Sequence, residues 1–219
     1  SVDNTGKRWE IHMLQVVTGG SGSGKSEYAE KLIAESALHR RIYVATMMVW
    51  DDEGRKRVRR HREMRSGKGF ITIEHYTGLS SLELSTCDKQ STGDKLSIGE
   101  KMALAAAVRE KALPQAGENT SVLLECMSNL ASNEFYRDEK NALNNILEGV
   151  EHLRRQCREL VIVTNEVFCD GMDYGADTMR YIRLLGEINC RLGQMADTVT
   201  EVVYGIPIRI KGQGREMRK

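Results

Sequence analysis

The sequence predicts an α/β domain with a mainly parallel central sheet flanked by helices. Short apolar runs of strand length alternate along the chain with segments whose apolar residues follow helical spacing. Aromatic residues make up 5% of the chain and there are two prolines, a composition that argues against an all-β sandwich with many tight turns. The length of 219 residues fits one domain with decorations rather than two domains.

The first half of the chain contains three predicted strands and two predicted helices. The run MLQVVT predicts a short buried strand, and the apolar spacing that follows Ser26 predicts a helix. Asp51 or Asp52 can cap a basic helix that runs to about Arg65. We therefore expect strands at residues 13–18, 41–47 and 70–74.

The second half continues the alternation. Residues 77–99 are rich in Ser, Thr, Gly, Asp and Lys, and we expect an inserted surface excursion there. Apolar runs predict further strands at residues 121–126, 159–164, 198–204 and 206–210. Apolar spacing predicts helices at residues 98–113, 139–157 and 176–195.

Three segments are expected along the chain. Residues 1–12 are polar and without period, which predicts a disordered leader or an appended remnant. Residues 13–212 form the predicted domain, which carries the surface insertion, and residues 213–219 form a C-terminal tail.

Composition excludes several classes of protein. Hydrophobic residues at 40% and charged residues at 29% are ordinary for a soluble globular protein. The net charge of 32 − 31 = +1 provides no global field for nucleic acid or a membrane surface. No apolar run approaches the roughly 18 residues of a transmembrane helix. The five cysteines form no C-x-x-C pair, so we expect neither zinc nor a disulfide framework but reduced thiols in the cytoplasm.

A phosphate-binding loop follows the first predicted strand. The pattern G-x4-G-K-S is complete and stands between a strand and a helix, which is the context that the motif requires. Backbone N–H groups would surround the phosphates, Lys25 would reach them, and Ser26 would ligate Mg²⁺. The alternative is a Gly/Ser-rich turn that fits by chance. The sequence predicts nucleoside triphosphate binding by Gly19, Gly20, Ser21, Gly22, Ser23, Gly24, Lys25 and Ser26.

Three polar residues follow buried strands and are candidates for the same site. Glu125 ends the run SVLLEC and could hold Mg²⁺ through water, although an ordinary strand-terminal carboxylate is the alternative. Asn165 and Glu166 follow the next apolar strand, where ligands bind in open α/β sheets. For these two residues, solvation of a loop remains an equally open interpretation.

A basic segment between Arg55 and Lys68 contains eight Lys or Arg residues against one acidic residue. Helical spacing places Arg57, His61 and Arg65 in one row. Two neighbouring guanidiniums disfavour the imidazolium form, and a neutral imidazole can attack phosphorus. The residues alone nevertheless favour a solvated basic face with an incidental histidine, and a strip that binds nucleic acid is a further alternative.

Several segments together resemble one family, the bifunctional adenosylcobinamide kinase/adenosylcobinamide-phosphate guanylyltransferases of cobalamin biosynthesis. The matching segments occur in the family's order and cover most of residues 13–212. They are VTGGSGSGKSEYAEKLI, IYVAT followed by DDE, the row of Arg57, His61 and Arg65, T-x-E at Thr72 to Glu74, LLEC, VTNEV, and INCRLGQMADTVTEVVYGIPIRIKG.

The resemblance implies a RecA-like P-loop fold and two reactions. The first transfers the γ-phosphoryl group of GTP, or of ATP, to adenosylcobinamide. The second transfers GMP from GTP to the resulting phosphate, with a histidine that carries GMP covalently, a position that His61 occupies. The resemblance also places Thr46, Met47, Met48, Arg65, Glu74 and Glu125 near the guanine nucleotide, and it implies a homo-oligomer, a trimer.

Two other functions remain as alternatives. One is a monofunctional P-loop kinase of another small hydroxyl substrate, which would not become labelled by the α-phosphate of GTP. The other is a P-loop ATPase that grips nucleic acid through Arg55 to Lys68, against which the near-neutral net charge speaks.

Overall fold

The computed structural model describes residues 12–48, 52, 56, 59, 63, 67–84, 117, 119–167 and 174–212. These residues form a seven-stranded sheet in the order β3-β2-β4-β5-β1-β6-β7. All neighbouring strands are parallel except β6 and β7, which are antiparallel. The strands are β1 (Met13–Thr18), β2 (Arg40–Ala45), β3 (Phe70–Glu74), β4 (Thr120–Glu125), β5 (Glu159–Val163), β6 (Thr198–Val203) and β7 (Ile206–Lys211).

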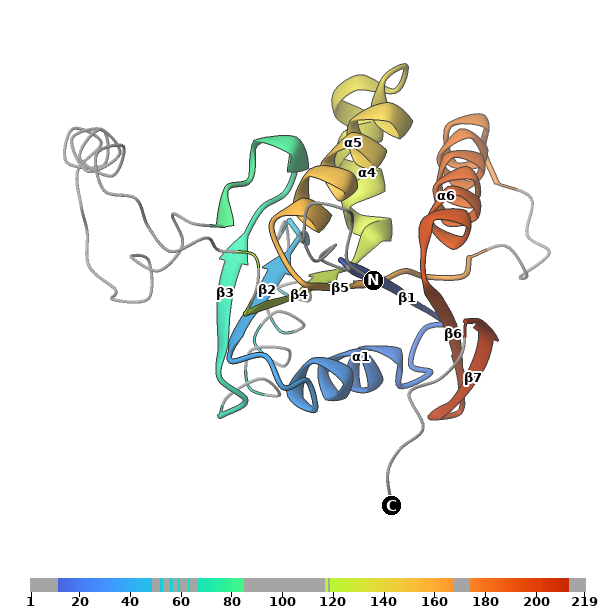
Figure 1. Ribbon diagram of the computed structural model, residues 1–219. Coiled ribbons are helices and arrows are strands. Elements are labelled where there is room, and N and C mark those ends of the chain that lie inside the picture. The colour runs from blue at the N-terminus through green and yellow to red at the C-terminus, as the bar shows by residue number, and fades with distance from the viewer. Residues whose placement is uncertain are drawn as a thin grey trace, which may run out of the picture.

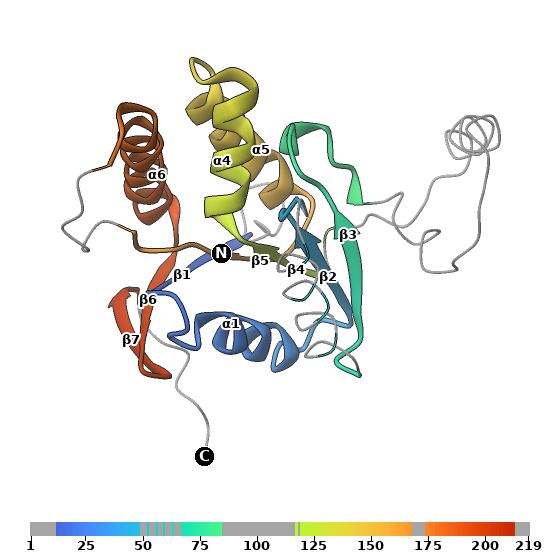
Figure 2. The same cartoon turned by 180° about the vertical axis from the view of Figure 1, so that it is seen from behind.

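Helices cover both faces of this sheet. Helix α1 (Lys25–Ala34) lies on one face, and α4 (Met127–Asp138), α5 (Ala142–Arg155) and α6 (Ala176–Met195) lie on the other (Figures 1 and 2). Each face therefore buries its own apolar cluster against its helices. Every residue of β4 and β5 is buried, as expected for central strands covered on both sides.

The predicted fold class is confirmed, and the predicted strands match the observed ones to within one or two residues. The helix predicted at residues 139–157 matches α5 to within three residues, whereas helix α4 was not predicted from the sequence. In the expected basic helix and its cap, the described residues Asp52, Lys56, Arg59 and Glu63 are helical and exposed. The helix expected at residues 98–113 lies outside the described residues.

The first eight residues of the expected surface excursion are packed on the core through three leucines, although Ser80, Ser81 and Glu83 are exposed. A short 3-10 helix, Leu79–Ser81, packs against α5, and Leu79, Leu82 and Leu84 are buried in the larger core cluster. Because residues 77–99 are mostly polar, their composition did not predict that these three leucines are buried. The leucines supply enough apolar area to hold the segment against the helix. Residues 85–99 lie outside the described residues.

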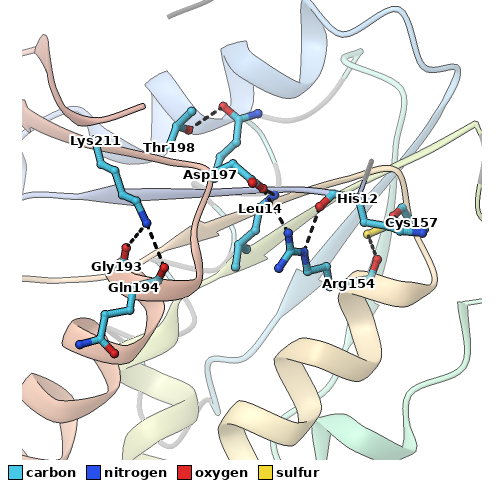
Figure 3. Close-up of polar contacts among 10 residues, drawn as sticks. His12, Leu14, Arg154, Cys157, Gly193, Gln194, Asp197, Thr198 and Lys211 are labelled. Carbon is cyan, nitrogen blue, oxygen red and sulfur yellow. Dashed lines mark hydrogen bonds and ion pairs between the residues drawn. The ribbon is translucent and has the colours of Figure 1, made fainter. Parts of the chain in front are cut away.

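Polar contacts tie the amino-terminal ends of the strands together (Figure 3). Asp197 precedes β6, and its carboxylate accepts hydrogen bonds from the Leu14 backbone at 2.7 Å and from Arg154 of α5 at 3.3 Å. Lys211 donates to the carbonyl oxygens of Gly193 and Gln194 and so caps the carboxyl end of α6. This end of the sheet is opposite to the end that carries the phosphate-binding loop, which follows the carboxyl end of β1.

Candidate nucleotide site at the carboxyl ends of the strands

The loop between β1 and α1 takes a conformation that its glycines make possible. Gly19 has φ +151°, and a Cβ atom there would lie 2.5 Å from the carbonyl oxygen of Val202. Gly24 has φ +90°, and a Cβ atom there would lie 3.3 Å from Gly205. Residues with side chains rarely adopt these angles, so the loop depends on glycine at both positions.

The amino end of α1 is open to an anion. Its N-cap residue is Gly24, and within the described residues no side chain caps the first turn, so the first backbone N–H groups are available for phosphate. Lys25 begins the helix and is only 8% exposed. Its ammonium group donates to the Gly20 carbonyl at 2.9 Å, and burial lowers the pKa of Lys25, an effect that Cys126 and Glu125 oppose.

Backbone hydrogen bonds from both neighbouring strands hold the loop. After β5, the N–H of Glu166 donates to Gly19 at 3.4 Å; after β6, the N–H of Gly205 donates to Ser23 at 2.8 Å. The sequence makes Glu166 a candidate through its carboxylate, and the structure shows a role for its backbone N–H. Sequence reasoning missed Gly205, for which the Y-G-I-P turn between two strands was the available signal.

The carboxylate of Glu125 lies beside the loop, as the sequence predicted. The hydroxyl of Ser26 donates to its Oε1, and the hydroxyl of Tyr43 donates to its Oε2 at 3.0 Å. Glu125 ends β4 and is 8% exposed, and β5 separates β4 from the strand that carries the loop. Lys25, Ser26 and Glu125 therefore come together from segments about a hundred residues apart. Sequence reasoning missed Tyr43.

This oxygen pair suits Mg²⁺. Mg²⁺ prefers hard oxygen ligands and keeps several waters, so it needs only one or two protein groups besides the phosphates. The Ser26 hydroxyl and the Glu125 carboxylate touch and belong to different elements. Among the described residues, no group of three or more His, Cys, Asp or Glu is placed to hold a metal ion.

The ends of β2 and β3 lie next to this carboxylate. Ala45 pairs with Glu125 on one side and with Glu74 on the other, so the two glutamates are at the same level, about 10 Å apart by strand spacing. Thr46 is buried, and its backbone N–H and its hydroxyl donate to the carbonyls of Glu125 and Cys126. Thr46 and Glu74, which the resemblance implies near the nucleotide, therefore stand at the same end of the sheet as Glu125.

Helix α4 holds these strand ends in place. The side-chain amide of Asn133 donates to the carbonyl oxygens of Thr46 and Tyr76, at 2.9 Å each. Met47 and Met48, which we also expected near the nucleotide, follow Thr46 and are half-buried. Asn133 thus joins the segments that leave β2 and β3, although α4 was absent from our sequence prediction.

The end of β5 carries a second polar network. The Asn165 amide donates to the Ser128 hydroxyl at 2.7 Å, and the Asn165 carbonyl accepts from Asn189 of α6 at 3.3 Å. Cys126 approaches the same hydroxyl at 3.1 Å, and burial raises the pKa of its thiol. Asn165 is therefore oriented by neighbouring side chains rather than only solvated in a loop.

The predicted nucleophile and its two guanidiniums, His61, Arg57 and Arg65, lie outside the described residues. Cys126, Cys157 and Cys190, the cysteines that the structure describes, are free thiols. In the described part of the chain, no helix is both long and apolar enough to cross a membrane.

Fold and site together define a P-loop nucleotide-binding protein. A prototypical ATPase from the type III secretion system of pathogenic bacteria shares the fold, with a TM-score of 0.51 and 11% sequence identity over 87% of this chain. The chain spans about half of that ATPase, 51% of its length. A family model described as cobinamide kinase / cobinamide phosphate guanyltransferase matches residues 15–94 and 89–210. The chain belongs to this family, and the resemblance inferred from its motifs is confirmed.

Relatives in three bacteria match along most of their length. The bifunctional adenosylcobalamin biosynthesis protein CobU of Escherichia coli is 27% identical and aligns over 91% of this chain and 100% of its own. The corresponding protein CobP of Pseudomonas aeruginosa is 28% identical over 92% of this chain and 99% of its own. CobU of Salmonella typhimurium is 26% identical over 91% of this chain and 100% of its own.

Proposed function

We propose that this protein is a cytoplasmic bifunctional enzyme of cobalamin biosynthesis. It phosphorylates adenosylcobinamide and then transfers GMP from GTP to the new phosphate, which gives adenosylcobinamide-GDP. The observation that carries the proposal is the contact of Ser26 with Glu125 beside an uncapped helix terminus, in a chain of the cobinamide kinase / guanyltransferase family.

The kinase step uses the loop. The backbone N–H groups of the first turn of α1 and the Lys25 ammonium bind the triphosphate, and Lys25 exchanges its bond to the Gly20 carbonyl for phosphate oxygens. The acceptor hydroxyl attacks the γ-phosphorus, the nucleoside diphosphate leaves, and the hydroxyl proton passes to solvent. Ser26 and Glu125, the latter through water, would hold Mg²⁺, which when bound neutralises charge on the phosphate oxygens.

The guanylyl transfer step uses the basic segment. The imidazole of His61 attacks the α-phosphorus of GTP, so that a phosphorus–nitrogen bond forms and pyrophosphate leaves. An oxygen of adenosylcobinamide phosphate then attacks that phosphorus and releases His61. Arg57 and Arg65 flank His61 at helical spacing; they disfavour its protonation and bind phosphate oxygens. Thr46 to Met48 and Glu74 border the nucleotide.

We also propose that the enzyme is a homo-oligomer, with a trimer as the expected state. Strand β7 is an edge strand on which Ile206, Ile208 and Ile210 are exposed, an apolar surface of the kind that subunit contacts cover. Light scattering after size-exclusion chromatography measures this state directly.

The decisive experiment follows the α-phosphate of GTP. Wild-type protein incubated with α-labelled GTP should retain an acid-labile, base-stable label through denaturation, whereas γ-labelled GTP should leave none on His61. The His61→Asn variant should lose this label and the GDP-linked product, because an amide cannot form a stable phosphoramidate. It should still phosphorylate adenosylcobinamide, since γ-phosphoryl transfer needs no covalent carrier.

A matched control is His39→Asn. His39 is exposed and stands just before the amino end of β2, at the end of the sheet opposite to the loop. The variant should therefore keep the label. An unchanged label in His61→Asn would remove His61 as the nucleophile. Absence of label in wild type, with adenosylcobinamide left unchanged, would favour a kinase of another hydroxyl substrate.

A further inference from the structure

The inference concerns the tyrosine that touches the carboxylate of Glu125. Tyr43 lies on β2, two residues before Ala45, which pairs with Glu125. Residues two apart on a strand point to the same face, so Tyr43 and Glu125 both face α1. The tyrosine is long enough to span this offset, and its hydroxyl donates to Oε2 of Glu125 at 3.0 Å in a buried contact.

Packing alone does not require this hydroxyl. The ring of Tyr43 is 4% exposed and packs edge-on against Phe70, with ring centroids 6.3 Å apart, a contact that phenylalanine would make equally well. The hydroxyl instead meets one oxygen of a carboxylate whose other oxygen accepts from Ser26. Both oxygens of Glu125 are therefore fixed from different elements, Ser26 from α1 and Tyr43 from β2.

Fixing both oxygens leaves the carboxylate with free lone pairs but little freedom to rotate. Each carboxylate oxygen has two acceptor positions, so Glu125 can still accept hydrogen bonds from metal-bound water. Groups that hold a metal partner in orientation typically contribute about tenfold to hundredfold to metal affinity.

We propose that Tyr43 is a positioning residue that orients the Glu125 carboxylate toward Mg²⁺ bound with the nucleotide. The inference rests on the proposed function only in assigning the Mg²⁺ role to Glu125. It does not depend on the acceptor, the corrinoid or His61, so it can be tested by nucleotide binding alone.

The test measures how the affinity for a nonhydrolysable GTP analogue depends on Mg²⁺ in the full chain. Tyr43→Phe keeps the ring and removes the hydroxyl. We expect it to raise the Mg²⁺ concentration for half-maximal enhancement of binding about tenfold, the size expected for one hydrogen bond to a charged group. Affinity without Mg²⁺ should stay within twofold of wild type, because phosphate binding by the loop is unaffected.

A control variant and a double-mutant cycle separate positioning from general loss of structure. Tyr181→Phe removes another partly buried hydroxyl, which donates to the Ser128 carbonyl at 3.0 Å, and should leave the Mg²⁺ dependence unchanged. In the Glu125→Gln background, Tyr43→Phe should cause no further shift, because the group through which Tyr43 acts is gone. Thermal unfolding of each variant without ligand shows whether it is folded.

The outcomes distinguish the inference from the proposed function. If Glu125→Gln weakens the Mg²⁺ dependence and Tyr43→Phe does not, or if the two effects add, the positioning role is wrong and the metal role of Glu125 stands. If Glu125→Gln binds as wild type does, the metal assignment fails and the inference falls with it. If the expected cycle is observed but the protein does not act on adenosylcobinamide, the inference stands and the proposed function fails.

Discussion

At the scale of single residues, Lys25 is a buried cation at the amino end of α1, and we propose that it binds phosphate. It is 8% exposed, and burial lowers its pKa from the ordinary value of 10.5. The unfolded chain therefore holds this proton more tightly than the folded protein, so stability rises with pH between the lowered pKa and 10.5. At pH values below that interval, Lys25 is charged and its burial destabilises the folded protein. A bound anion would offset this destabilisation.

We predict that Lys25→Met lowers the affinity for GTP about tenfold to hundredfold, since a charge-assisted contact to phosphate is lost. The ligand-free variant should unfold no earlier than wild type at neutral pH, and any advantage should shrink as the pH rises toward 10.5. Calorimetric GTP titration and thermal unfolding at several pH values measure both effects.

The matched control for this variant is Lys31→Met on the same helix. Lys31 pairs with Glu35 on the exposed side of α1, where a surface ion pair contributes little. It should leave both GTP affinity and unfolding nearly unchanged. Wild-type GTP affinity in Lys25→Met would remove Lys25 from phosphate binding.

At the scale of elements, two helical glycines should respond in opposite ways to the same substitution. Gly149 lies on α5, where a Cβ atom would meet the Leu79 Cβ at 2.6 Å and the Ser80 nitrogen at 3.1 Å. At Gly193, near the end of α6, a Cβ atom would have nothing within 4 Å. At Gly149, the close packing of residues 77–84 on α5 therefore makes alanine destabilising. At Gly193, the higher helix propensity of alanine makes the same substitution stabilising.

We predict that Gly149→Ala destabilises the protein by about 1–2 kcal/mol. The gain of roughly 1 kcal/mol in helix propensity is smaller than the cost of about 1–3 kcal/mol or more for forcing a methyl group into a packed contact. Gly193→Ala should stabilise by up to about 1 kcal/mol. Denaturant unfolding of both variants checks this pair; equal shifts would mean that α5 and residues 77–84 do not pack tightly.

At the scale of the whole molecule, the charge is nearly balanced. The chain carries 32 basic and 31 acidic residues, so the basic segment from Arg55 to Lys68 is compensated elsewhere and no global field draws in a polyanion. We therefore expect nucleotide binding to depend on local groups at the carboxyl ends of the strands rather than on the overall charge.

We therefore predict that single-stranded or duplex nucleic acid neither stimulates GTP turnover nor binds tightly at physiological salt. GTP turnover with and without nucleic acid, and fluorescence anisotropy of a labelled oligonucleotide at two salt concentrations, test this. Stimulated turnover with a steep salt dependence would instead support a motor or binding protein that grips nucleic acid through the basic segment.

The sequence by itself determined the strands, α1, α5, α6 and the phosphate-binding loop. Each of these depends on local information: apolar runs of strand length, helical spacing, and a glycine pattern whose backbone geometry is the same wherever it occurs. The sequence also predicted a Mg²⁺ role for both Ser26 and Glu125; the structure brings their side chains into contact, because the carboxyl ends of parallel strands meet at one end of a sheet, and the metal role stays a prediction.

Only the tertiary structure decided which side chains complete the site. The bond from Tyr43 to Glu125 joins residues 82 positions apart, and it depends on β2 and β4 being neighbours in register. The hydrogen bonds of Asn133 to the ends of the strands depend on how α4 packs on the sheet. The burial of Leu79 and Leu84 likewise depends on how α5 packs. Local periodicity carries no information on sheet order or helix packing, because both are set by how distant apolar faces fit together.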